Sequence, residues 1–189
     1  MEKNIPTFLK GHLLMAFPTL ADPNFQSSVT CISEHNAEGA MGIMVNRLHN
    51  DIHLGMIFDE LKIKYGAMPG LVPVFSGGPV HVNELFVLHG EPLGGYGGFP
   101  INNSLALSNS REILEDIASG VGPKDYLVAL GCAGWAPGQL EWELSQNAWL
   151  TGPYDHGIIF DTPVETRWER AVKLLGIDPN LLSEDIGHA

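Results

Sequence analysis

The sequence predicts an α+β fold, because many short apolar strands and a few amphipathic helices follow one another without strict alternation. Strict alternation would favour a doubly wound parallel sheet. The chain has 189 residues, which suits one domain over residues 1–189, and its hydrophobic share of 44% is close to the average for globular proteins. A domain of this length buries enough surface to fold without a disulfide or a metal.

Strand signals come first because they are the most numerous. Each is a short run of apolar or β-branched residues bounded by Gly, Pro, Asn or Asp. The first three predict an antiparallel meander, and residues 91–103, rich in glycine, predict a long loop. The predicted strands are residues 12–17, 28–33, 41–45, 71–75, 85–89 and 126–130, with 157–160 as a further candidate.

Helix signals are fewer. Thr162-Pro163-Val164-Glu165 matches a capping box with proline at the first helical position, and Gly176 predicts the end of that helix. A second helix is predicted over residues 110–119, with Asn109 as its N-cap. Two further helices are predicted, one beginning near Pro137 and one over residues 54–61.

The charge balance is acidic, with 10 Lys and Arg against 22 Asp and Glu and a formal net charge of −12. Affinity for DNA comes largely from basic side chains that neutralise phosphates, and anionic lipid surfaces attract the same groups. The balance therefore disfavours direct binding to nucleic acid or to a membrane surface. Arg167, Arg170 and Lys173 form one basic cluster, but Glu165 and Glu169 lie among them.

The cysteines and the N-terminal segment favour a cytoplasmic protein. Cys31 and Cys132 belong to no C-x-x-C pair, the first residues do not form a secretory signal, and no window of 18 apolar residues occurs. Neither a cofactor motif nor a metal-binding motif is present. His49 and His53 have the i,i+4 spacing of zinc ligands, but the H-E-x-x-H glutamate is missing.

Cys132 is the one candidate nucleophile, because it precedes the helix predicted near Pro137, whose dipole would favour a thiolate. A nucleophile also needs a base, and spacing places none of the chain's histidines beside it. We favour a small buried residue in a tight turn. Trp135, Trp142 and Trp149 recur every seven residues and are expected to pack in the core.

Gly77-Gly78-Pro79-Val80 follows a predicted strand. Successive N–H groups in such a turn can form an anion nest, but neither a P-loop nor a dinucleotide motif is present. A sharp turn between strands is the simpler interpretation.

Several blocks taken together resemble the bacterial AlgH/YqgE family. The resemblance implies a mixed, mostly antiparallel sheet that curls toward a partial barrel, with helices packed around it. It supplies no set of catalytic residues, and it implies a role in regulating transcription. The main blocks are GHLLMAFP at 11–18, VNR at 45–47, GGPV at 77–80, FVLH at 86–89 and GWAPGQLEWEL at 134–144.

Our first hypothesis is a non-catalytic cytoplasmic protein with a regulatory or interaction role, which binds another protein or a small ligand. The absence of a catalytic motif and the acidic charge both favour it. The alternative is a small-molecule-binding protein or an enzyme, with its site at the strand-end turns around Gly77-Gly78 and Trp135–Gln139. That alternative requires convergence of His35, Asn46, Arg47, Gly77, Gly78, His89, Trp135 and Gln139 on one concave pocket.

Overall fold

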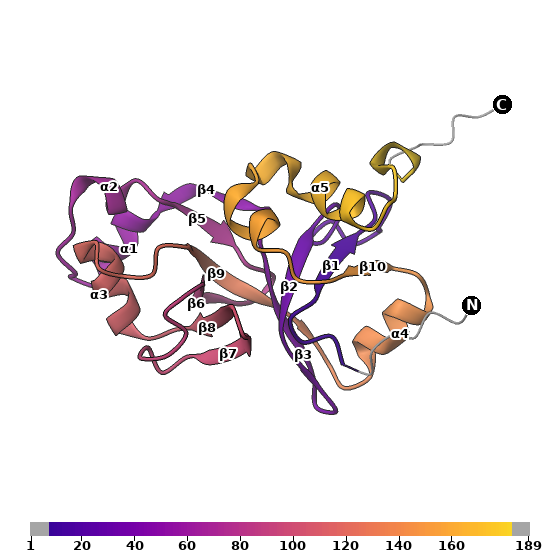
Figure 1. Cartoon of the computed structure of the whole chain (residues 1–189), viewed down its shortest axis with the longest axis horizontal. Helices are drawn as coiled ribbons and strands as arrows, with labels where there is room; N and C mark the ends of the chain where they lie inside the picture. The colour runs from indigo at the N-terminus through magenta and orange to yellow at the C-terminus, as the bar shows by residue number, and fades with distance from the viewer. Residues whose placement is uncertain (1–7, 183–189) are drawn as a thin grey trace.

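The computed structural model describes residues 8–182 and has an α+β architecture: one open, mixed and mostly antiparallel sheet with flanking helices (Figure 1). The strands are β1 (Leu13–Ala16), β2 (Val29–Asn36), β3 (Gly39–Met44), β4 (Leu48–His53), β5 (Pro73–Ser76), β6 (Val80–His89), β7 (Phe99–Asn102), β8 (Leu105–Ser108), β9 (Tyr126–Trp135) and β10 (Trp149–Gly152). The α-helices are α1 (Leu54–Glu60), α2 (Ala67–Gly70), α3 (Arg111–Ser119), α4 (Gln139–Ser145) and α5 (Arg167–Leu174).

Strand β9 joins the two halves of the sheet. Its C-terminal residues pair with β3, and its N-terminal residues pair with β6 and, in parallel, with β5. The strand order is β10-β1-β2-β3-β9-β6-β8-β7, and β4 is attached through β5. The predicted mostly antiparallel sheet is confirmed, including the opening meander of β1, β2 and β3. The sheet stays open and does not close into a barrel.

Both faces of the sheet are covered, which explains why its strands are continuous apolar runs in the sequence. Successive side chains of a strand point to opposite faces. Leu13 and Met15 of β1 thus join one core with α5, whereas Leu14 packs with α4 in another. The third core lies between α1, α3 and the strands β5, β6 and β9.

Two predictions near the C-terminus were wrong. The candidate strand at 157–160 is a single π-helical turn over Gly157–Asp161, because side chains satisfy its backbone. Asp155 accepts from the Ile158 N–H at 2.9 Å, and the Thr162 hydroxyl donates to the Gly157 carbonyl at 2.8 Å. Thr162 is therefore not the predicted N-cap, and a 3₁₀ turn over Val164–Thr166 precedes α5.

Smaller corrections concern a cap and several short strands. The N-cap of α3 is Ser110 rather than Asn109, since the Ser110 hydroxyl accepts from the Ile113 N–H. The predicted loop at 91–103 contains β7, which lies at the edge of the sheet, where Pro100 is tolerated although it cannot donate to a ladder. No residue ranges were predicted for the strands β4, β8 and β10, which are short or strongly polar.

Candidate functional site

The predicted site residues Asn46 and Arg47 tie one loop to the end of β3. Asn46 Oδ1 accepts from the Val29 N–H at 2.7 Å, and its Nδ2 donates to the Ser27 carbonyl at 2.8 Å. The Arg47 guanidinium donates to the carbonyls of Pro23 and Gln26 at 3.2 and 2.6 Å. These contacts hold the connection between β1 and β2 in place, so both side chains have a structural task.

Gly77 and Gly78 lie where the chain between β5 and β6 touches β9. The Gly77 N–H donates to the Leu130 carbonyl at 2.8 Å. A Cβ on Gly77 would lie 2.2 Å from the Gly131 carbonyl oxygen. A Cβ on Gly78, whose φ is +151°, would lie 2.2 Å from the Cys132 carbonyl carbon. The glycines therefore permit a close backbone approach, which confirms a sharp turn between strands.

Trp135 and Gln139 belong to a hydrogen-bond network around the carboxylate of Glu143 on α4. Trp135 Nε1 and Trp149 Nε1 both donate to Glu143 Oε2, at 2.9 and 2.8 Å. Gln139 Nε2 donates to Glu143 Oε1 at 2.9 Å, and its Oε1 accepts from the Ala136 N–H. Both indoles are almost fully buried, so the carboxylate satisfies two donors that water does not reach. Core packing of Trp135 and Trp149 is confirmed, whereas Trp142 is 64% exposed.

Replacing Glu143 by alanine is expected to destabilise the protein by about 2 kcal/mol, because two buried indole N–H groups lose their acceptor. Chemical denaturation followed by tryptophan fluorescence measures this change. The matched control is Trp142→Ala on the same helix, for which we expect less than about 0.5 kcal/mol because Trp142 is exposed. Equal effects of the two substitutions would contradict this account of the network.

His35 on β2 is buried beside the same helix. Its Nδ1 accepts from the Leu9 N–H at 2.9 Å, so the ring carries its proton on Nε2, which donates to Glu141 Oε1 at 3.0 Å. The imidazole thereby connects the segment before β1 to α4. It lies against the edge of Phe8, with 5.3 Å between the ring centroids.

His89 at the end of β6 lies apart from the other predicted site residues. Its Nδ1 donates to the Gly90 carbonyl at 2.8 Å, and its ring meets Tyr96 edge-on at 5.7 Å between centroids. Within residues 8–182, its Nε2 is buried without a hydrogen-bond partner. Burial lowers the pKa of His89, and the bond to Gly90 partly opposes this shift. The neutral ring is thus favoured, as in a packed aromatic residue.

The cysteines and histidines form no reactive or metal-binding cluster in the described chain. Cys132 lies inside β9 rather than in a turn, and burial raises its pKa, with a smaller contribution from Glu84. This favours the thiol over the nucleophilic thiolate. Over residues 8–182, no three His, Cys, Asp or Glu side chains gather as a metal site requires. His49 and His53 lie on β4 rather than on a helix.

The three residues of the basic cluster predicted on the last helix differ in burial: Arg167 is buried, whereas Arg170 and Lys173 are exposed. Arg167 points into the core, where it donates to the carbonyls of Val45 and Thr162 and lies over the Phe75 ring. Arg170 is exposed, and Lys173 is 3.8 Å from Glu169. Since Arg167 is only 6% exposed, it cannot contact a phosphate backbone. This arrangement further disfavours direct DNA binding through α5.

The eight predicted site residues are distributed over separate places. Arg47 and Gly78 line one open cavity, and Trp135 lines another. His89 lines neither of them. The structure therefore does not bring the eight residues together in one concave pocket.

None of the helices within residues 8–182 has the length and the apolar composition that a bilayer-spanning helix needs.

An apolar groove that the sequence analysis did not predict lies between α1 and the strands β6 and β9. The space within it, part of it open solvent, is about 670 Å³, and Glu60 is the one charged residue among the described residues that line it. The groove is lined by Ile52, Met56, Ile57, Glu60, Leu61, Asn83, Leu85 and Leu130. Met56 on α1 and Leu61, the C-cap residue of that helix, are 46% and 36% exposed, whereas the buried face of the helix points into the core. One feature of the sequence could have indicated the groove: α1 carries more apolar residues than a single face of a helix can bury.

The fold defines the class of protein: an α+β domain with an open, mostly antiparallel sheet. Its distinctive sequence blocks, such as 45–47, 77–80 and 134–144, form strand ends and turns of that sheet and contacts to α4. The chain belongs to the AlgH-like family, whose model matches residues 13–180. A UPF0301 protein of Desulforapulum autotrophicum is 45% identical over 181 residues, 96% of each chain. One from Thioalkalivibrio sulfidiphilus is 48% identical over 180 residues, 95% of this chain and 96% of that one.

Solved structures agree with the family assignment. The AlgH protein from Pseudomonas aeruginosa is 43% identical and superposes with a TM-score of 0.80 over 100% of both chains. A protein from Corynebacterium diphtheriae, 21% identical, has a TM-score of 0.75 over 97% of this chain and 95% of that one, and shares the fold.

Proposed function

We propose that this protein is a non-catalytic cytoplasmic interaction protein that binds an apolar, positively charged segment of a partner protein in the groove beside α1. One observation carries the proposal. Six of the fourteen exposed large hydrophobic side chains of the described chain lie within residues 48–71, a segment that includes α1 and α2 at one end of the molecule (Figure 1). These six are Leu48, Met56, Leu61, Tyr65, Met68 and Leu71.

Exposed apolar side chains that line a groove, as Met56 and Leu61 do, mark interaction surfaces, because leaving them in water costs free energy that a partner can recover. A net charge of −12 and the carboxylate of Glu60 in the groove favour a partner segment with positive charge. The same charge, together with the buried Arg167, argues against direct binding to DNA. A regulatory role of the protein would then act through the partner.

A photo-crosslinking amino acid at position 56, in the groove, tests the proposal in a bacterial lysate. The matched control carries the same group at position 121, where Val121 is 71% exposed outside the groove. We expect one protein to crosslink at position 56 and not at position 121. The purified partner should bind Met56→Lys at least tenfold more weakly than the unaltered protein and should bind Val121→Lys normally.

Two results would overturn the proposal. One is the same set of crosslinked proteins at both positions, which would indicate nonspecific contact. The other is retention of defined DNA duplexes at low salt, lost steeply as the salt concentration rises. That result would favour a regulator that contacts DNA directly.

A further inference from the structure

A second cleft lies on another part of the molecule, between the β2–β3 hairpin and the strands β6, β7 and β8. It exists because β3 pairs with the C-terminal part of β9, whereas β6 pairs mainly with the N-terminal part, so the two wings of the sheet diverge. The space within the cleft, part of it open solvent, is about 440 Å³, and its described lining residues are all different from those of the groove beside α1.

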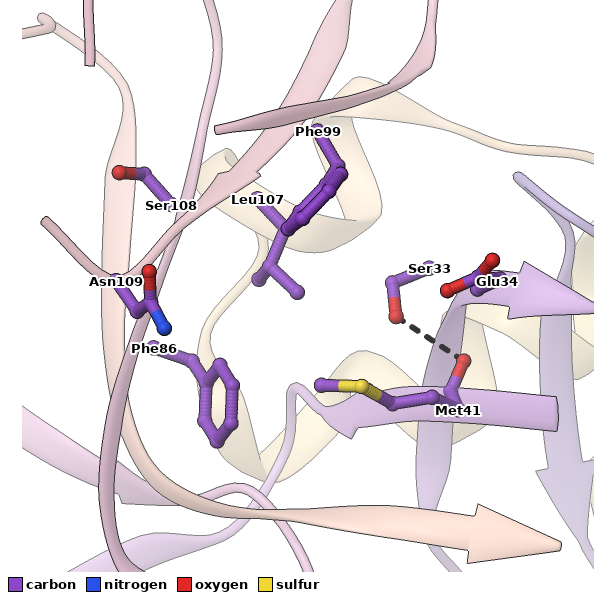
Figure 2. A pocket seen from close by; sticks show the side chains of 8 residues that line it. All are labelled: Ser33, Glu34, Met41, Phe86, Phe99, Leu107, Ser108 and Asn109. Carbon is purple, nitrogen blue, oxygen red and sulfur yellow. Dashed lines mark hydrogen bonds between the residues drawn. The ribbon is translucent and has the colours of Figure 1, made fainter. Parts of the chain in front are cut away.

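The walls of this cleft are aromatic and apolar. Figure 2 shows the side chains of Phe86, Phe99, Leu107 and Met41 pointing toward one another around a common space. Phe86 and Leu107 are buried, whereas Phe99 on the edge strand β7 is 69% exposed. An exposed phenyl ring in a cleft that a second phenyl ring also lines offers a surface that an apolar body or a cation can cover.

The charge around the cleft has one sign. Glu34 lines it, and Glu34 and Met41 also line an adjoining cavity of about 520 Å³ that contains Glu38. Neither Lys nor Arg is among the described residues that line either cavity. Glu34 accepts one hydrogen bond, from Asn36 Nδ2 at 3.1 Å, and a carboxylate can accept several.

We propose that this cleft binds a small organic cation, with its apolar body between Phe86 and Phe99 and its charged nitrogen toward Glu34. The aromatic faces attract a cation through their quadrupoles, and the carboxylate supplies a full negative charge at the mouth. Besides Glu34 and Asn109, the polar side chains of the lining are Ser33 and Ser108, whose hydroxyls donate within the protein to the Met41 and Tyr96 carbonyls. The acidic surface raises the local concentration of cations.

The probes are 2-phenylethylammonium and its neutral analogue 2-phenylethanol, titrated into the full-length protein and followed by NMR at the Met41 methyl group. We expect saturable binding of the ammonium compound and at least tenfold weaker binding of the alcohol. Glu34→Gln and Phe99→Ala should each weaken the ammonium compound about fivefold or more. Both residues are exposed, so these variants should fold, and unchanged NMR spectra elsewhere verify this.

The control variant is Glu112→Gln, which removes one exposed carboxylate at the start of α3 that lines neither the cleft nor the adjoining cavity. It should bind the ammonium compound like the unaltered protein. The proposal is overturned if no saturable binding occurs, if the alcohol binds equally well, or if Glu112→Gln weakens binding as much as Glu34→Gln. The last result would mean general attraction to an acidic surface.

Discussion

Gly78→Ala is expected to prevent folding or to destabilise the protein by more than about 4 kcal/mol. A Cβ at this position would lie 2.2 Å from the Cys132 carbonyl carbon and 2.3 Å from the Ala133 nitrogen. Both atoms belong to the backbone of β9, so no side-chain rotation relieves the clash. The φ of +151° is also one that residues with a Cβ rarely adopt. Soluble yield and thermal unfolding followed by circular dichroism measure the effect.

Gly97→Ala separates the clash from backbone strain. Gly97 also has a positive φ, +62°, but a Cβ on this residue would meet nothing within 4 Å among the described residues. Alanine there should cost about 1–2 kcal/mol, the usual cost of the left-handed conformation. If Gly78→Ala cost no more than Gly97→Ala, the close approach of the turn to β9 would not be the reason for the glycine.

Arg167→Ala is expected to destabilise the protein by about 3 kcal/mol or more. The substitution leaves the carbonyls of Val45 and Thr162 without their donor in the core, and hydrogen bonds from a charged group are among the stronger ones. It also removes the guanidinium that lies 5.3 Å from the centroid of the Phe75 ring. Burial lowers the pKa of Arg167, because water reaches the guanidinium poorly. Urea denaturation measures the loss.

Arg170→Ala is the matched control, because Arg170 lies on the same helix and is exposed. Its effect should stay within about 0.5 kcal/mol. Arg167→Met retains much of the apolar stem and should recover only part of the stability, since the carbonyls stay unpaired. Equal effects of Arg167→Ala and Arg170→Ala would show that the buried hydrogen bonds contribute little.

Gly78 and Arg167 are residues that the sequence suggested for a functional role, in a turn and in a basic cluster. Gly78, Arg47 and Trp135 attracted notice because they lie in distinctive blocks, and the structure gives each a local structural task. A particular residue type is required wherever two backbone segments approach each other closely, or wherever a buried hydrogen-bond donor needs an acceptor. Such constraints depend on contacts between distant segments, as between Gly78 and Cys132 or between Arg167 and Val45.

The sequence by itself determined the α+β class, the resemblance to the AlgH family, most of the longer strands and the location of the main helices. These features depend on local periodicity and on turn residues, which neighbouring positions in the chain reveal. The acidic balance was likewise a property of composition alone. This net negative charge already argued against a surface that binds the phosphates of nucleic acids.

Only the tertiary structure decided which side chains meet. The apolar groove beside α1 and the aromatic cleft between β3 and β7 each collect residues from segments far apart in the chain. Short strands such as β7 and β10 form because neighbouring strands supply their hydrogen bonds. Arg167 is likewise buried because the distant Val45 carbonyl accepts its hydrogen bond. Long-range pairing of this kind leaves no period in the sequence, so it could not be predicted from one chain.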